Sequence, residues 1–155
     1  MYKRQSSYTA HAYVLVAPTA ERSGDLSGTE LAQAFARVGA DPAVVGPAFA
    51  AEGLPARPQD IAKAVTAAAS PDAPLIDVTG ASPSAKQSAL LANTAARGLI
   101  DHVGRLGATP GSKLVLLTPA TVPDQPDSSP ILTYTLLGLT VGLGGCGAIA
   151  SLSRP

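Results

Sequence analysis

The chain has 155 residues and a formal net charge of zero at pH 7, from 11 basic and 11 acidic side chains. This length accommodates one compact domain with a short additional segment, but not two domains. The charge balance gives no basic excess of the kind that nucleic-acid binding requires, so nucleic acid is not expected as a partner. The single cysteine cannot form an intramolecular disulfide, and its sequence context favours a small packing residue.

The first five residues, Met-Tyr-Lys-Arg-Gln, match the translation of a common sequencing adapter. We therefore interpret residues 1–5 as an adapter-derived artefact and exclude them from fold reasoning. On this interpretation the natural chain extends upstream of Ser6. The absence of a signal peptide or a first membrane helix from the sequence is then uninformative.

The first half of the chain predicts one strand followed by three short helices. The strand covers residues 7–16, and the helices cover residues 30–38, 43–52 and 59–69. The strand prediction follows from alternating side chains of high β-propensity. Thr29 is the expected N-cap of the first helix, and Asp41 and Pro42 open the second. Ile61 and Val65, four residues apart, are expected to face the core from the third helix.

The second half predicts a strand, the longest helix and a final strand. These cover residues 75–79, a helix from Ser82 or Ser84 to about Leu106, and residues 113–117. One face of the long helix is apolar, with Leu91, Ala95, Leu99, Val103 and Leu106, and another is polar, with Asn93, Arg97, Asp101 and Arg105. The apolar composition of the final strand predicts burial on both of its faces.

These elements indicate an α/β (α+β) domain over residues 6–118, in which a small sheet of three or more strands is packed by helices on one side. We expect the first and last strands to be neighbours if both ends of the domain return to the same membrane. The sequence shows no internal repeat and no low-complexity segment.

A proline-rich collar and a transmembrane helix are predicted after the domain. The collar covers residues 119–130, and its prolines should keep the chain extended and free of helix: Pro119, Pro123, Pro126 and Pro130. Residues 131–152 form a run of 22 residues without a charge, which as a helix would span roughly 33 Å, enough to cross a bilayer. Small residues spaced by four would let another helix approach closely: Gly138 with Gly142, and Gly144 with Ala148.

The charges that flank the apolar run predict its orientation. Arg154 follows the run, and Asp124 and Asp127 precede it. Positive charge is enriched on the cytoplasmic side of membrane helices, so residues 153–155 should be a cytoplasmic stub. The main domain should then lie outside the cytoplasm, anchored in the cell membrane.

No catalytic, cofactor-binding or metal site is predicted. Residues 80–87 connect a strand to a helix, as a phosphate-binding loop does, but Ala85 precedes Lys86 where Gly is required and Gln87 follows where Ser or Thr is required. His11 and His102 have no ligand-spaced partners in the sequence. Asp77 is expected on the solvent face of its strand. The chain is therefore expected not to be an enzyme.

Taken in order, these segments resemble the Wzz-type chain-length determinants, also called polysaccharide co-polymerases, whose domain also occurs in subunits that modulate bacterial tyrosine kinases. The resemblance is carried by residues 8–16, 34–35, 42–45, 52–54, 75–79, 89 and 91–93, and most specifically by Pro119, Pro123, Pro126, Ser129-Pro130, Gly138 and Gly142. The family usually opens the long helix with an acid–proline pair, whereas this chain has Ser82-Pro83 or Ser84-Ala85 at that place.

The resemblance implies a membrane-anchored co-polymerase that regulates chain length in exopolysaccharide, capsule or surface glycan biosynthesis. Its implied partners are further copies of the chain, a glycan polymerase and its lipid-linked glycan. The alternative is a transmembrane adaptor that activates a cytoplasmic tyrosine kinase, which a long segment after Arg154 would favour. A third class, an enzyme acting on a surface polymer, would need a polar cleft with convergent acids or a nucleophilic triad.

Overall fold

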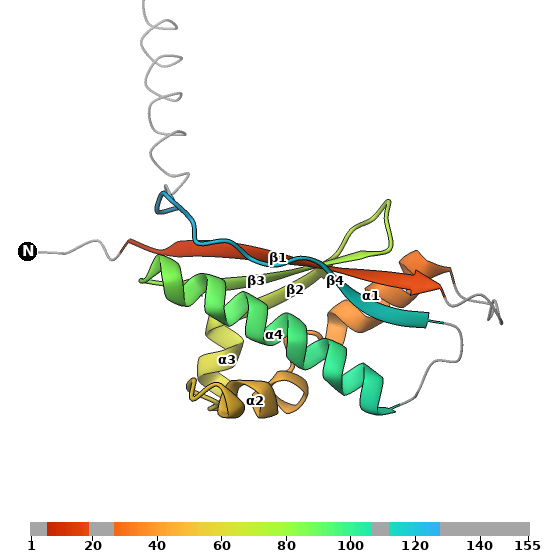
Figure 1. Cartoon of the computed structure of the whole chain (residues 1–155), viewed down its shortest axis with the longest axis horizontal. Helices are drawn as coiled ribbons and strands as arrows, with labels where there is room; N and C mark the ends of the chain where they lie inside the picture. The colour runs from red at the N-terminus through yellow and green to blue at the C-terminus, as the bar shows by residue number, and fades with distance from the viewer. Residues whose placement is uncertain (1–5, 19–26, 107–111, 128–155) are drawn as a thin grey trace, which may run out of the picture.

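The computed structural model describes residues 6–18, 27–106 and 112–127. Within these residues, a four-stranded sheet is packed by four helices in an α+β domain (Figure 1). The elements in chain order are β1 (Tyr8–Pro18), α1 (Gly28–Val38), α2 (Pro42–Ala51), α3 (Pro58–Ala64), β2 (Val65–Ala69), β3 (Leu75–Ser82), α4 (Ala85–Leu106) and β4 (Ser112–Thr118). The predicted fold class, a sheet of three or more strands packed by helices, is confirmed.

The sheet is antiparallel, with the strand order β2-β3-β1-β4. β1 therefore lies in the middle, paired with β3 on one side and with β4 on the other, which confirms that the first and last strands are neighbours. The register between β1 and β4 shifts between Tyr13 and Val14. Such an irregularity bends a strand and commonly marks where pairing ends.

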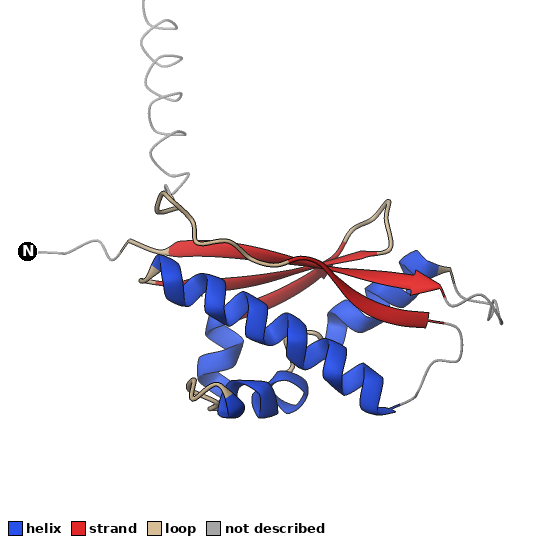
Figure 2. Cartoon of the chain, in the orientation of Figure 1, coloured by secondary structure: helices blue, strands red, loops and turns tan. Residues whose placement is uncertain are grey.

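The helices lie on one side of the sheet, and the hydrophobic core lies between them and the strands (Figure 2). β3 shows strict alternation of buried and partly buried residues, and the odd and even positions of β1 differ in the same way. The largest fully buried side chains of the covered face and its helices are Val14, Val16, Val45, Phe49, Ile61, Val65, Ile76, Val78 and Leu99. The fold is thus two layers deep.

The long helix α4 lies very close to the sheet, because small residues line the contact. A Cβ atom added to Gly80 of β3 would lie 2.4 Å from the carbonyl oxygen of Ser88 and 2.6 Å from the amide nitrogen of Ala92. Ala10 and Ala12 of β1 are also buried in this layer. The predicted apolar positions of α4 are buried as expected, except that Leu106 is 60% exposed.

Helix α1 begins at Gly28, two residues earlier than the predicted start at Glu30. Ser27, not Thr29, is the N-cap: its hydroxyl accepts a hydrogen bond from the Glu30 amide, and the Glu30 carboxylate accepts one from the Ser27 amide. This reciprocal pair satisfies two donors that the first turn leaves free. The bond from the Ser27 backbone, followed by that from its side chain, lowers the pKa of Glu30.

Residues 65–69 form strand β2, so the prediction of a third helix over residues 59–69 is wrong in its second half. Helix α3 ends at Ala64, and Val65–Ala69 pairs with β3 from Gly80 to Ile76. Ile61 and Val65 are both buried as predicted. Pairing with a neighbouring strand has overridden the helix propensity of the alanines, as tertiary context commonly does.

Strand β4 is not buried on both faces, so the prediction of two-sided burial for the final strand is wrong. It is an edge strand with β1 as its neighbour. Leu114 is buried, whereas Val115 and Leu117 are 40% and 54% exposed. An apolar run predicts a strand covered on both sides only when helices cover both faces of the sheet, and here the helices lie on one.

In the part of the chain that the structure describes, none of the helices combines the length and the hydropathy of a bilayer-spanning segment. The predicted adapter segment, residues 1–5, and the predicted transmembrane helix, residues 131–152, both lie outside the described residues. The stub at residues 153–155 does as well. The membrane anchor therefore stays a prediction.

Candidate functional site

The feature that most bears on function is the end of the domain where the proline-rich segment meets the start of β1. Pro119, Pro123 and Pro126 lie in residues 119–127, which contain neither helix nor strand, as predicted for the collar. Figure 1 shows this segment running back beside the first half of β1. Prolines have no amide hydrogen, so the segment cannot continue the regular ladder of β4.

Two contacts fix the far end of the segment beside the beginning of the domain. The Asp127 amide donates to the Ser7 carbonyl oxygen at 2.8 Å, and the hydroxyl of Thr9 donates to the Asp127 carboxylate. The chain therefore enters and leaves the described domain at the same place. The sequence predicted that the first and last strands would be neighbours, but it gave no indication of these particular contacts.

A third contact holds the segment near its beginning. The side-chain amide of Asn93, on α4, donates to the Ala120 carbonyl oxygen at 3.0 Å, and its oxygen accepts from the Ala120 amide at 2.8 Å. Asn93 was predicted to lie on the polar, wet ladder of the long helix. It does lie on that side, but its side chain is partly buried and bonded to Ala120 instead of facing solvent. Arg97, Asp101 and Arg105 of that ladder are exposed as predicted.

The remaining predicted site residues cannot be placed. Pro130 and the proposed helix-packing residues lie outside the described residues: Gly138, Gly142, Gly144 and Ala148. Their roles in membrane entry and helix packing stay predictions.

The open face of the sheet carries a histidine–carboxylate pair. The Nδ1 atom of His11 on β1 lies 3.0 and 3.1 Å from the two carboxylate oxygens of Asp77 on β3. The ring of Tyr13 is nearly parallel to that of His11, with 6.4 Å between ring centroids. The prediction that Asp77 lies on the solvent side of its strand is confirmed, since the side chain is 33% exposed.

The sequence could not reveal this pair, because His11 and Asp77 meet only through the register of β1 with β3. Tyr13 is opposite Asp77 and His11 is opposite Thr79, so the ion pair is a diagonal one. Diagonal neighbours are within reach of long side chains. Both partners are substantially exposed, so the geometry supports an ordinary surface hydrogen bond, which is an ion pair only when His11 is protonated.

The turn between β3 and α4 shows why residues 80–87 resembled a phosphate loop without being one. The Ser84 amide, which could have faced an anion, donates instead to the Ser82 hydroxyl, and that hydroxyl donates to the Gln87 side chain. Gly80 is explained by the close approach of α4 rather than by a ligand. A hollow of about 200 Å³ beside the turn is lined by Phe49, Pro55, Asp60, Ala64, Ala81, Ser82, Pro83, Gln87 and Leu91.

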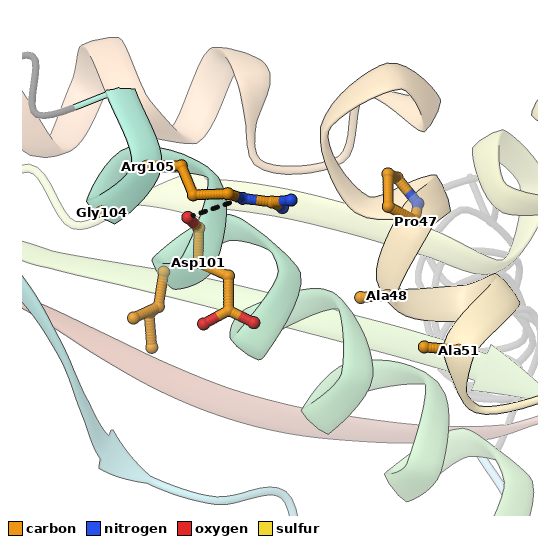
Figure 3. Close-up of a pocket in the computed structure, with 7 residues that line it drawn as sticks. Pro47, Ala48, Ala51, Asp101, Gly104 and Arg105 are labelled. Atoms are coloured by element: carbon orange, nitrogen blue, oxygen red, sulfur yellow. Dashed lines mark hydrogen bonds between the residues drawn. The ribbon is translucent and has the colours of Figure 1, made fainter.

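A wider, open hollow of about 640 Å³ lies between α2 and α4 (Figure 3). Pro47, Ala48, Ala51 and Ile100 give it apolar walls, and Asp101, Gly104 and Arg105 complete the lining. The Nε atom of Arg105 donates to the backbone oxygen of Asp101 at 3.3 Å. One carboxylate and one guanidinium group line this hollow, and they offer neither a nucleophile nor a pair of convergent acids.

No group of three or more His, Cys, Asp or Glu residues in the described ranges could hold a metal ion. No known protein-family model matches this sequence, and no curated protein is detectably similar to it. Two features of the chain bear on function: the start and the end of the described domain meet at Ser7 and Asp127, and an uncharged run follows in the sequence.

Proposed function

We propose that the chain is a membrane-anchored polysaccharide co-polymerase, which regulates chain length in exopolysaccharide, capsule or surface glycan biosynthesis. The observation that carries the proposal is the hydrogen bond between Asp127 and Ser7, which brings entry and exit of the domain together. This arrangement suits a domain that is tethered to one membrane by both of its ends. The uncharged residues 131–152 begin only a few positions beyond Asp127.

In this proposal the contribution of the domain is geometric. The main domain lies outside the cytoplasm, and copies associate through their outer domains and through the glycine-lined face of the membrane helix. The resulting cluster sets how far a membrane polymerase extends its lipid-linked glycan. The short connection from the last described contact to the apolar run supports this, because it would hold the domain close to the bilayer surface.

The test is deletion of the intact gene in its source organism, with glycan length read from the ladder on a gel. The expected result is loss of the preferred glycan length, restored by the intact gene. A matched version lacking residues 131–152 should not restore it, because the domain would no longer be held at the membrane. An unchanged length distribution after deletion would refute the proposal.

A further inference from the structure

The starting observation is that Ala120 is buried, at 7% exposure, where no strand is available to pair with it. Regular pairing between β1 and β4 ends at Tyr13 with Thr118. A buried backbone amide or carbonyl group without a partner is costly, so each normally finds one. The Ala120 groups must therefore be satisfied from outside the sheet.

Asn93 satisfies both groups with one side chain. Its NH₂ group donates to the Ala120 oxygen, and its oxygen accepts from the Ala120 amide, at 3.0 and 2.8 Å. The amide of an asparagine carries one acceptor and a donor group side by side, as a peptide unit does. Asn93 thus replaces the neighbouring strand that the proline segment lacks.

The helix that presents Asn93 is firmly fixed. Asn93 is flanked by Ala92 and Thr94, and both are buried against the rest of the domain. At the other end of the segment, Asp127 is held by Ser7 and Thr9. Residues 120–127 are consequently attached at two points, Ala120 to α4 and Asp127 to the start of β1. Two separated attachments determine the direction of this segment, whereas a single attachment would let it turn.

We propose that Asn93 is a positioning residue that clamps residues 120–127, the exit segment, to α4 and so fixes the direction in which the chain leaves the domain. The clamp itself stands on the two hydrogen bonds. Its consequence, that the domain is held at a fixed angle to the bilayer, rests on the proposed function. Asparagine is required because aspartate lacks the donor and alanine lacks both groups.

The first experiment is amide hydrogen exchange on the full chain in lipid nanodiscs, comparing the wild type with Asn93→Ala. Loss of two hydrogen bonds should raise the exchange rate of the Ala120 amide about tenfold or more, since each contributes roughly 1 kcal/mol. The Asp127 amide should exchange faster as well. In Asn93→Asp, the exchange rate of the Ala120 amide should lie between the wild-type rate and the rate in Asn93→Ala. Arg97→Ala, one turn along the same helix and exposed, is the matched control and should change neither amide.

The exchange rate of the Val14 amide, in the centre of the sheet, shows whether Asn93 acts only on the proline-rich segment or stabilises the whole domain. The Val14 amide should exchange at the wild-type rate in Asn93→Ala. A change of less than twofold at Ala120, or an equal increase at Ala120 and Val14, would overturn the proposal. If Asn93→Ala fails to fold, the Asn93→Asp comparison decides, because it keeps the acceptor and loses only the donor.

The second experiment measures direction. Spin labels on Lys86→Cys and Gln125→Cys, two exposed positions on α4 and the exit segment, are introduced in a Cys146→Ser background. The distance distribution between the labels should be narrow in the wild type and broader in Asn93→Ala. An equally narrow distribution would refute the clamp, whereas a broad distribution with unchanged glycan lengths would leave the clamp standing and remove its link to the proposed function.

Discussion

The two faces of the sheet are made from alternate residues of the same strands, yet they obey different constraints. On the covered face, small and branched aliphatic side chains such as Ala12, Val14 and Ile76 are inaccessible to solvent. On the open face, His11, Tyr13 and Asp77 take the intervening positions and remain substantially exposed. The same backbone therefore carries one closely packed surface and one surface that is largely exposed to solvent.

The contrast between the two faces predicts where a sequence change should alter stability. On the covered face, the separation between sheet and helix is set by side chains with little volume, so both added and removed atoms are felt. On the open face, apolar residues such as Leu117 lie beside polar ones without a helix to cover them. Changes there should affect the surface and leave the fold intact.

The largest effect should come from a cavity under the centre of the sheet. Ile76 is 0% exposed and lies opposite Val14 in the register of β3 with β1. Ile76→Ala should lower the free energy of unfolding by about 2–5 kcal/mol, measured by denaturant titration. Thr79→Ala, on the open face of the same strand, should cost less than about 1 kcal/mol. Equal losses at the two positions would remove the distinction between the faces.

A pair of glycines should give effects of opposite sign. Gly80→Ala would force a Cβ atom against the backbone of α4 and should destabilise the domain by about 1–3 kcal/mol. Gly104→Ala is the matched change. Gly104 lies in α4 itself, and a Cβ atom added there would have no other atom within 4 Å. It should stabilise the helix by about 0.5–1 kcal/mol. Thermal unfolding of both variants checks the signs, and a tolerated Gly80→Ala would show that the helix can move away from the sheet.

The smallest effect should come from the ion pair on the open face. A double-mutant cycle with His11→Ala and Asp77→Ala should yield a coupling free energy of about 0.2–1 kcal/mol, because both side chains are partly exposed and their attraction is screened. Denaturant unfolding of the two single variants and the double variant, at low and high salt, measures it. A much larger coupling would indicate that the open face is covered in the native protein.

The sequence was most informative where local pattern and tertiary environment agree. Alternation in β1 was sufficient to predict that strand, and the spacing of Leu91, Ala95, Leu99 and Val103 was sufficient to predict α4 and its buried side. It failed at β2, where Ile61 and Val65 at a helical spacing are both buried but lie in different elements. Pairing with β3 decides that case, and a single-sequence pattern carries no information about pairing.

The contacts of the candidate site were beyond the sequence for the same reason. The spacing of Asn93 from Arg97 and Asp101 correctly placed it on the less apolar side of α4, but the return of Ala120 to that side depends on the path of the whole chain. The predicted collar could be read from its prolines because proline acts locally on its own backbone. The residues to which the collar is attached could not be predicted from the sequence.

The central position of β1 has a consequence for how the domain forms. β1 is the first strand in the chain, but both of its neighbours come much later, and β4 is separated from it by most of the described residues. Because loop closure must precede such pairing, folds dominated by distant contacts form slowly. Until β4 has been synthesised, β1 keeps an unpaired edge of the kind that promotes association with other chains. A chaperone that shields this edge during synthesis or export would therefore be expected to raise the yield of the folded protein.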